Sequence, residues 1–167
     1  MQMDKAADIE EIRQVLYRYC RGLDRMDRAL VDGCFAPGAT VDYLAIHRGT
    51  AVSFLDEVWV RHAVHWRHSH QMANVLVELD GDRAASETYV TVALWSAPGP
   101  RATELVVRGR YLDEWARMTD GWVIVRRTFV TDLRTRMHLG PDPLGTLGAS
   151  SARDKSDPSY DFLPLDR

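Results

Sequence analysis

Hydrophobic residues recur at spacings of three and four near the start of the chain and at every second position in its later half. Ile9, Ile12, Leu16, Tyr19, Cys20 and Leu23 make up the first set. This spacing predicts an amphipathic helix whose apolar side packs against a core. Asp24 follows at the edge of that apolar stripe.

Two shorter helices are expected next, each with a capping residue before it. Asp27 precedes RALVDGCF, which is predicted to be helical through Phe35 and to end at Pro37 and Gly38. A strand, GATVDYL, and a hairpin-like HRG come next. Thr50 is then placed to cap a third helix, AVSFLDEVWVRH.

From about residue 69 the hydrophobic period becomes two, which is typical of strands with one buried face. Four long segments show it: MANVLVEL, AASETYVTVALW, TELVVRGRYLDEWAR and WVIVRRTFVTDLR. Turn residues such as DGD and TDG separate them, which favours antiparallel hairpins. Helices followed by a strand meander predict an α+β fold, in which a curved antiparallel sheet forms a cone around the N-terminal helices. A cavity is expected at the open end of the cone.

We interpret residues 1–136 as a single domain and residues 137–167 as a C-terminal tail rich in Gly, Pro, Ser and Asp. Such a composition is typical of partly disordered chain. However, Tyr160, Phe162, Leu163 and Leu165 are apolar enough to dock. The tail could therefore also cover the cavity or reach a neighbouring subunit, and both alternatives stay open.

Composition narrows the functional classes. The 167 residues carry a formal net charge of -3, with basic and acidic residues interleaved, so the sequence does not favour nucleic-acid binding. The first residues are polar and acidic, and no apolar run approaches the roughly 20 residues that a membrane span needs. We therefore expect a cytoplasmic protein without membrane contact, with Cys20 and Cys34 as buried thiols.

The stretch HWRHSH, residues 65–70, packs three histidines into six positions, with His62 just upstream. Metal sites need side chains that converge from fixed directions, and helical histidine pairs usually do so at a spacing of four. The spacing here is irregular and the cluster contains no carboxylate. A metal site stays an alternative, but we predict a protein that needs neither metal nor cofactor.

A strand beginning near Ser69 would place His70, Met72 and Asn74 on one side, a mixture suited to the wall of a partly apolar pocket. Asp24, at the edge of an apolar helix face, needs a hydrogen-bond donor, and the imidazole of His70 is a suitable one. A carboxylate on one ring nitrogen leaves the other as a general base. Tyr19, on the same helix, could donate from its phenol to a substrate oxygen, or could equally be a core tyrosine.

The stretches IEEIRQVLYRYCRGLDRMDRALVDGCFAPGATVDY, HSHQMANVLVELDGDRAASETYV, VVRGRYLDEWAR and DGWVIVRRTFVTDLR resemble the SnoaL-like group of the nuclear transport factor 2-like superfamily. The resemblance covers roughly residues 6 to 136. It implies a cone of curved sheet closed by helices, and commonly a homodimer or homotrimer. One fold hosts many activities, so the resemblance alone does not settle function.

Within that group the pattern is most similar to cofactor-independent lyases, namely scytalone dehydratase, bile-acid dehydratase and hexachlorocyclohexane dehydrochlorinase. Their catalytic aspartate, histidine and, in the dehydratases, tyrosine fall on Asp24, His70 and Tyr19. Arg134 falls on a position that lies near the pocket mouth in family members. The chain departs from the pattern around Val92, where bile-acid dehydratase has a further acid, and it lacks a second strand histidine matching scytalone dehydratase.

Three hypotheses follow. The first is a lyase or isomerase acting on a hydrophobic cyclic molecule of steroid or polyketide type, with His70 as base, Asp24 as its partner and Tyr19 as donor, and with Met72, Asn74 and Arg134 binding substrate. The second is a structural small subunit of a ring-hydroxylating dioxygenase, which would not need Asp24 and His70 paired in an apolar cavity. The third is a ligand-binding module with the same pocket and no turnover.

Overall fold

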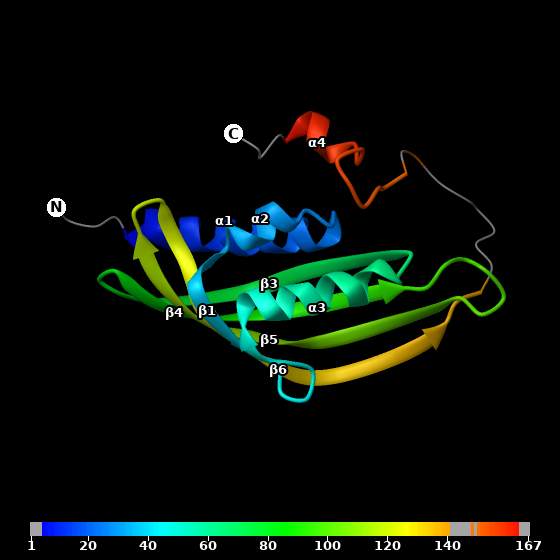
Figure 1. The fold of residues 1–167 in the computed structure, drawn as a ribbon, viewed down its shortest axis with the longest axis horizontal. Helices are drawn as coiled ribbons and strands as arrows, with labels where there is room; N and C mark the ends of the chain where they lie inside the picture. The colour runs from blue at the N-terminus through cyan, green and yellow to red at the C-terminus, as the bar shows by residue number, and fades with distance from the viewer. Residues whose placement is uncertain (1–4, 141–147, 149, 164–167) are drawn as a thin grey trace.

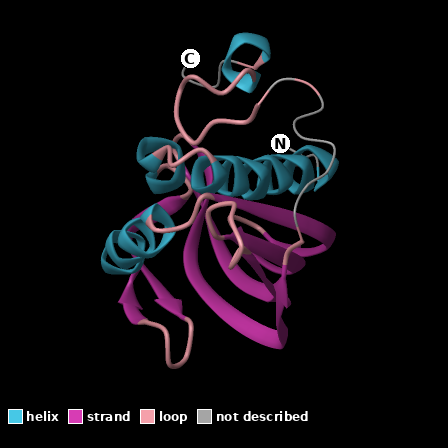
Figure 2. Ribbon diagram, turned by 90° about the vertical axis from the view of Figure 1, so that its right-hand side faces the viewer, coloured by secondary structure: helices cyan, strands magenta, loops and turns pink. Residues whose placement is uncertain are grey.

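Four helices and a six-stranded sheet make up the computed structural model, which describes residues 5–140, 148 and 150–163. The helices are α1 (Lys5–Asp24), α2 (Arg28–Asp32), α3 (Ala51–Ala63) and α4 (Ser159–Phe162). The strands are β1 (Phe35–Asp42), β2 (Arg48–Thr50), β3 (Arg67–Asp80), β4 (Arg83–Trp95), β5 (Thr103–Met118) and β6 (Gly121–His138). The sheet curves, and α1 to α3 cover its concave face (Figures 1 and 2), so the predicted α+β cone is confirmed.

The predicted caps are confirmed, but the second helix is shorter than expected. The carboxylate of Asp27 accepts a hydrogen bond from the Leu30 backbone at 3.3 Å, and the Thr50 hydroxyl accepts one from the Ser53 backbone at 3.2 Å. The prediction that this helix includes Phe35 and ends at Pro37 and Gly38 is wrong, because Phe35 already pairs with Ile124 of β6. Sheet hydrogen bonds to β6 therefore override the helical spacing after Asp32.

The strand order is β2-β1-β6-β5-β4-β3, and β3 to β6 form the antiparallel meander that the period of two predicts. β1 runs parallel to β6, so the antiparallel sheet has one parallel pair of strands. Alternation along one strand reports which side chains are buried, whereas it does not report which strand lies beside it or in which direction. β3 is left at one edge of the sheet, beside α1.

A bulge in β3 changes the predicted set of inward side chains. The pairing of β3 with β4 slips between Ala73 and Leu76, and Asn74 adopts a positive φ of 50°. One extra residue in a strand moves every later side chain to the opposite face. Asn74 and Leu76 are therefore exposed, while Val77 points inward, and the prediction that Asn74 shares the face of His70 and Met72 is wrong.

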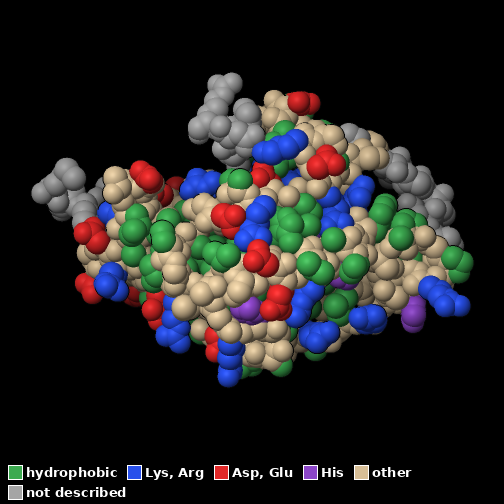
Figure 3. Space-filling view, viewed as in Figure 1, with side chains coloured by type: hydrophobic (Ala, Val, Ile, Leu, Met, Phe, Trp, Pro, Cys, Tyr) green, Lys and Arg blue, Asp and Glu red, His purple; other side chains and the backbone are tan. Residues whose placement is uncertain are grey.

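The core lies between the concave face of the sheet and the helices. Its largest fully buried side chains include Trp115, Trp122, Arg127, Tyr19 and Leu16. Cys20 and Cys34 are free, buried thiols, as predicted, and burial raises the pKa of each to about 12. None of the helices in the described ranges is long and apolar enough to cross a membrane. On the face shown in Figure 3, basic and acidic side chains are interspersed.

Residues 150–163 lie against the C-terminal end of α1 and the start of β3, on the side of the helices away from the sheet (Figure 1). The Tyr160 hydroxyl donates to Asp27 at 3.0 Å, and Arg25 pairs with Asp157 at 3.1 Å. Phe162 is exposed, and Leu165 lies outside the described residues. Polar contacts to the turn between α1 and α2, rather than the apolar residues Phe162 and Leu163, therefore hold this segment.

Candidate active site

The structure brings Asp24 and His70 into direct contact. Asp24 is the last residue of α1, and its carboxylate meets the free edge of β3. His70 Nδ1 lies 2.7 Å from Asp24 Oδ1, and the His70 backbone N–H donates to both carboxylate oxygens at 3.0 Å. The two side chains are 4% and 12% exposed. Backbone and ring contacts together fix the position of the imidazole relative to the helix end.

This contact determines which nitrogen of His70 carries the proton. A carboxylate accepts, so Nδ1 must donate, and a neutral ring then has an unprotonated Nε2. Within the described ranges, Nε2 of His70 has no hydrogen-bond partner. The arrangement therefore offers a lone pair on Nε2 and a carboxylate that would stabilise the imidazolium formed by protonation.

Two further histidines surround His70, and the sequence suggested a role for them only in the alternative of a metal site. The ring centroids of His62, from α3, and His68, from β3, lie 5.6 and 5.9 Å from that of His70, and 4.4 Å from each other. His68 Nε2 donates to the Leu23 carbonyl at 2.7 Å. Burial lowers the pKa of His68 to about 4 and that of His62 to about 2, so both rings are neutral near neutral pH.

The described residues contain no group of three or more His, Cys, Asp and Glu side chains arranged to hold a metal ion. In the histidine cluster, one nitrogen of His68 is bonded to the Leu23 carbonyl and one nitrogen of His70 to Asp24. These hydrogen bonds to protein groups fix the positions of the two imidazole rings.

Tyr19 is in a different environment from the Asp24–His70 pair. Its side chain is 1% exposed, and its hydroxyl lies 3.5 Å from that of Tyr43. The guanidinium carbon of Arg127 lies 4.3 Å from the Tyr19 ring centroid. Burial raises the pKa of Tyr19 and Arg127 opposes the rise, so the phenol stays protonated. Its contacts within the described chain are with an aromatic cluster of Phe35, Tyr43 and Tyr111 rather than with Asp24 or His70.

The ion pair beneath Tyr19 was not predicted. Arg127 of β6 donates two hydrogen bonds to Asp113 of β5, both at 2.7 Å, and both side chains are fully buried. The alternation of β5 indicates that Asp113 is buried, because it shares the inward face of Tyr111 and Trp115. A charged residue at an inward position needs a partner, but only the register of β5 with β6 identifies it.

The other predicted binding residues lie apart from the pair's immediate contacts. Met72 is half-buried and packs against the core. Arg134 lies opposite Val107 near the end of β6 and is exposed. Asn74 is exposed at the bulge described above. Their roles in binding stay predictions.

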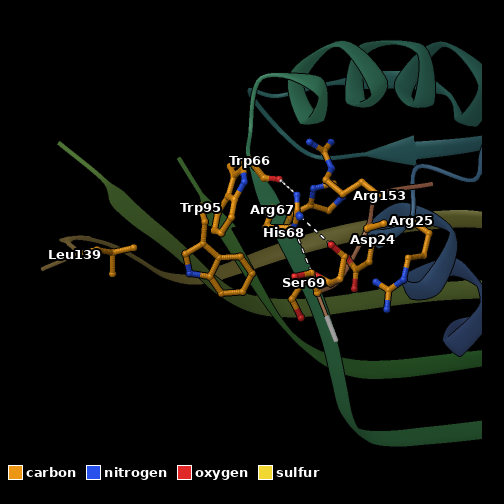
Figure 4. Close-up of a pocket in the computed structure, with 12 residues that line it drawn as sticks. Asp24, Arg25, Trp66, Arg67, His68, Ser69, Trp95, Leu139 and Arg153 are labelled. Atoms are coloured by element: carbon orange, nitrogen blue, oxygen red, sulfur yellow. Dashed lines mark hydrogen bonds between the residues drawn. The ribbon is translucent and has the colours of Figure 1, made fainter. Parts of the chain in front are cut away.

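A cavity of about 630 Å³ lies beside the pair, at the edge of the sheet (Figure 4). Its wall comprises Asp24, Arg25, Trp66, Arg67, His68, Ser69, Trp95, Leu139, Ser150, Ser151, Ala152 and Arg153. The volume is within the range of small-molecule sites. His68 and Ser69 are neighbours that point to opposite faces of β3, so the cavity wraps around the strand edge. Asp24 is in its wall, whereas His70 is not among the lining residues.

The profile of the SnoaL-like domain family matches residues 4–128. The chain belongs to the SnoaL-like domain family. An uncharacterized protein of Mycobacterium tuberculosis, Rv2910c, is 29% identical over 132 residues, which span 76% of this chain and 87% of that protein. The family assignment confirms the resemblance inferred from the sequence motifs.

Solved structures show the same fold for this SnoaL-like protein. The hexachlorocyclohexane dehydrochlorinase LinA-type3 from Novosphingobium barchaimii superposes with a TM-score of 0.71 at 15% identity, covering 85% of this chain and 100% of that one. The Kfla4162 protein from Kribbella flavida also superposes with a TM-score of 0.71, at 20% identity, covering 79% and 95% of the two chains. At these identities the likeness concerns the fold.

Proposed function

We propose that this SnoaL-like protein is a cofactor-independent lyase or isomerase in which His70 abstracts a proton from carbon. The observation that supports it is the 2.7 Å contact of His70 Nδ1 with Asp24 Oδ1, together with an Nε2 that has no partner among the described residues. A carboxylate bonded to one imidazole nitrogen orients the ring and stabilises the charge that appears when the other nitrogen takes a proton. The pair thus has the two properties that a general base needs.

The proposed reaction starts with transfer of a proton from a C–H bond next to a carbonyl to Nε2 of His70. The electron pair of that bond moves toward the carbonyl and forms an enolate. In a lyase, the enolate then expels a leaving group such as hydroxide from the neighbouring carbon as the double bond forms. In an isomerase, the imidazolium returns the proton to a different carbon.

The surroundings favour a hydrophobic substrate with a ring system. The cavity wall that contains Asp24 also contains Trp66 and Trp95, whose flat indoles can contact a planar or cyclic molecule. A solved relative with the same fold is a dehydrochlorinase, and dehydrochlorination is likewise an elimination. Tyr19 as the donor to a substrate oxygen stays part of the proposal.

The paired geometry also weighs against the structural-subunit alternative. A purely structural subunit would not require an imidazole and a carboxylate in contact at 4% and 12% exposure, respectively. Holding such a pair away from water has a free-energy cost that packing alone would not require. A binding module without turnover is distinguished from an enzyme by experiment.

Deuterium wash-in from D2O tests the proposal, because exchange at carbon can be detected whichever product forms. A panel of hydrophobic cyclic ketones, with and without a β-hydroxyl group, is incubated with the protein, and deuterium at the carbon next to the carbonyl is measured by mass spectrometry. We expect exchange or elimination with wild type and its loss with His70→Ala. Exchange at the wild-type rate in His70→Ala would contradict the proposal, and His138→Ala, at the exposed end of β6, is the matched control.

A further inference from the structure

Two of the three arginines that line the cavity have no carboxylate partner among the described residues. Arg67 donates to the Ser151 hydroxyl and carbonyl and to the Trp66 carbonyl, at 3.1, 2.8 and 2.9 Å. Arg153 donates to the carbonyls of His62 and His65. The third, Arg25, is paired with Asp157. The two guanidinium charges at the cavity are therefore neutralised by no side chain in the described part of the protein.

Arg153 is also under-satisfied as a donor. Its Nε is buried and has no hydrogen-bond partner among the described residues. Burial, followed by the positive charge of Arg67, lowers the pKa of Arg153. A buried charged donor without an acceptor is unfavourable, and an anion in the cavity would relieve both the missing hydrogen bond and the repulsion.

The same cavity presents aromatic surface. Trp66 is 47% exposed, and the guanidinium carbon of Arg67 lies 4.8 Å from its ring centroid. Trp95 faces Arg67 across the β3–β4 pair. Figure 4 shows the two tryptophans toward one side of the cavity and Arg153 and Arg25 toward the other. A ligand that suits this arrangement has a flat apolar body and a charged group at one end.

The carboxylate already in the wall does not oppose such a ligand strongly, because Asp24 is engaged by the ring and backbone of His70. The C-terminal segment completes the site, since Ser150, Ser151 and Arg153 all line the cavity. Ser151 accepts the hydrogen bonds of Arg67, which lies 84 residues earlier in the chain. The tail thus supplies one of the two arginines that have no carboxylate partner in the described ranges, Arg153, and helps to position the other, Arg67.

We infer that this cavity binds the carboxylate of a planar organic acid, with Arg67 and Arg153 holding the anionic group and Trp66 and Trp95 contacting the ring. The inference rests on the proposed function only in treating that acid as the substrate or product of His70. Binding itself requires no chemistry at the imidazole, so the two can be tested separately.

The test compares naphthoate with naphthamide by isothermal titration calorimetry, because the two have the same ring and nearly the same shape but differ in charge. We expect one naphthoate per chain and binding of naphthamide at least about tenfold weaker, since a charged hydrogen bond contributes roughly ten- to a hundredfold. Arg67→Gln should weaken naphthoate binding by about tenfold or more. Arg83→Gln, at the exposed start of β4, is the control and should have no effect.

Arg153→Gln removes contacts that hold the tail, so a second measurement uses the wild-type protein alone. The dissociation constant of naphthoate should rise with salt, while that of naphthamide should not. Equal affinity for both probes, equal effects of Arg67→Gln and Arg83→Gln, or no detectable binding would each overturn the inference. Naphthoate binding to the wild-type protein involves no proton transfer to His70, so a failed proton abstraction and a failed anion site give different results.

Discussion

At the scale of single residues, the central feature is a carboxylate that accepts hydrogen bonds from both the ring and the backbone of one histidine. The backbone N–H of His70 donates to Asp24 as well as its Nδ1. Replacement of the carboxylate therefore changes both the orientation of the ring and the end of α1. This double role distinguishes Asp24 from an aspartate that only neutralises charge.

We predict that His70→Ala lowers kcat/KM on the true substrate by roughly 100- to 10,000-fold, the usual contribution of a positioned general base. Asp24→Asn should have a comparable effect, because an amide can present its N–H to Nδ1 and select the wrong tautomer. Tyr19→Phe should cause a smaller loss, since Tyr19 contacts the aromatic cluster instead of the pair. Circular dichroism of each variant checks the fold, and near wild-type activity of His70→Ala would refute the role of the base.

The buried histidines predict a loss of stability in mild acid. The pKa of His68 is lowered from 6.5 to about 4 and that of His62 to about 2, both chiefly by burial. Between pH 6.5 and about 4 the unfolded chain therefore binds protons that the folded chain does not, so the free energy of unfolding falls as pH falls. The lowered pKa values of Asp8, Asp27 and Asp157 add to this loss only below about pH 5, so the upper part of the window reports the histidines.

Urea unfolding at a series of pH values checks this prediction. His62→Gln removes one titrating ring, so its free energy of unfolding should depend less on pH between 6.5 and 4 than that of wild type. His138→Gln changes an exposed ring and should leave the slope unchanged. An identical slope in His62→Gln and wild type would show that His62 is not buried as described.

At the scale of elements, two of the ion pairs that join β5 to β6 occupy neighbouring positions but have very different surroundings. Asp113 and Arg127 are fully buried, whereas Glu114 and Arg126 are exposed on the opposite face, at 3.4 Å. Removal of one member of a buried pair leaves an unpaired charge in the core, while exposed pairs contribute little. The neighbouring positions therefore form a matched experiment on the same two strands.

We predict that Asp113→Ala lowers the free energy of unfolding by about 3–5 kcal/mol, whereas Glu114→Ala changes it by about 1 kcal/mol or less. Because Arg127 lies over the rings of Tyr19 and Tyr111, the first change should also alter near-ultraviolet circular dichroism. Chemical denaturation measures both variants. Equal, small effects would contradict the burial of Arg127.

Elements also show how far the sequence determines the fold. Periods of three to four and of two predicted α1, α3 and the four long strands, because each buries one face against a single core. Alternation failed at Asn74, where one bulged residue reverses the faces of β3. It also could not reveal that β1 lies parallel to β6, because neighbours and direction depend on the path of the chain.

The site, like the fold, could be predicted only in part from the sequence. Asp24 and His70 are separated by 46 residues, and apolar context plus the family motifs indicated their pairing. The contributions of His62, Arg67 and Arg153 could not be predicted, since they depend on the end of α3, the edge of β3 and the tail meeting at one place. Arg153 contacts a carbonyl 91 residues away, and no local pattern reports such a distance.

At the scale of the whole molecule, the face of the sheet opposite the helices has exposed apolar side chains. Tyr89, Leu112, Leu133 and Met137 are between 37% and 51% exposed on β4, β5 and β6. Apolar residues grouped on one exposed face are typical of association surfaces. This face is therefore the surface that we propose for a homodimer or homotrimer.

Light scattering coupled to size-exclusion chromatography tests this proposal. We expect a mass of two or three times the 19.0 kDa chain. Leu112→Glu should shift the protein toward the monomer, because it places a charge within the proposed contact. Val52→Glu, on the exposed side of α3, is the control and should not change the mass. A wild-type mass of one chain would refute association through this face.

The central claim is that Asp24 fixes His70 as a base with its lone pair on Nε2. Nitrogen-15 NMR of the histidine rings tests this most directly, because protonated and unprotonated ring nitrogens have distinct chemical shifts. In mildly alkaline buffer we predict that His70 has a protonated Nδ1 and an unprotonated Nε2, and that Asp24→Ala mixes the two tautomers. A His70 ring protonated on Nε2, or one that does not change in Asp24→Ala, would contradict the claim.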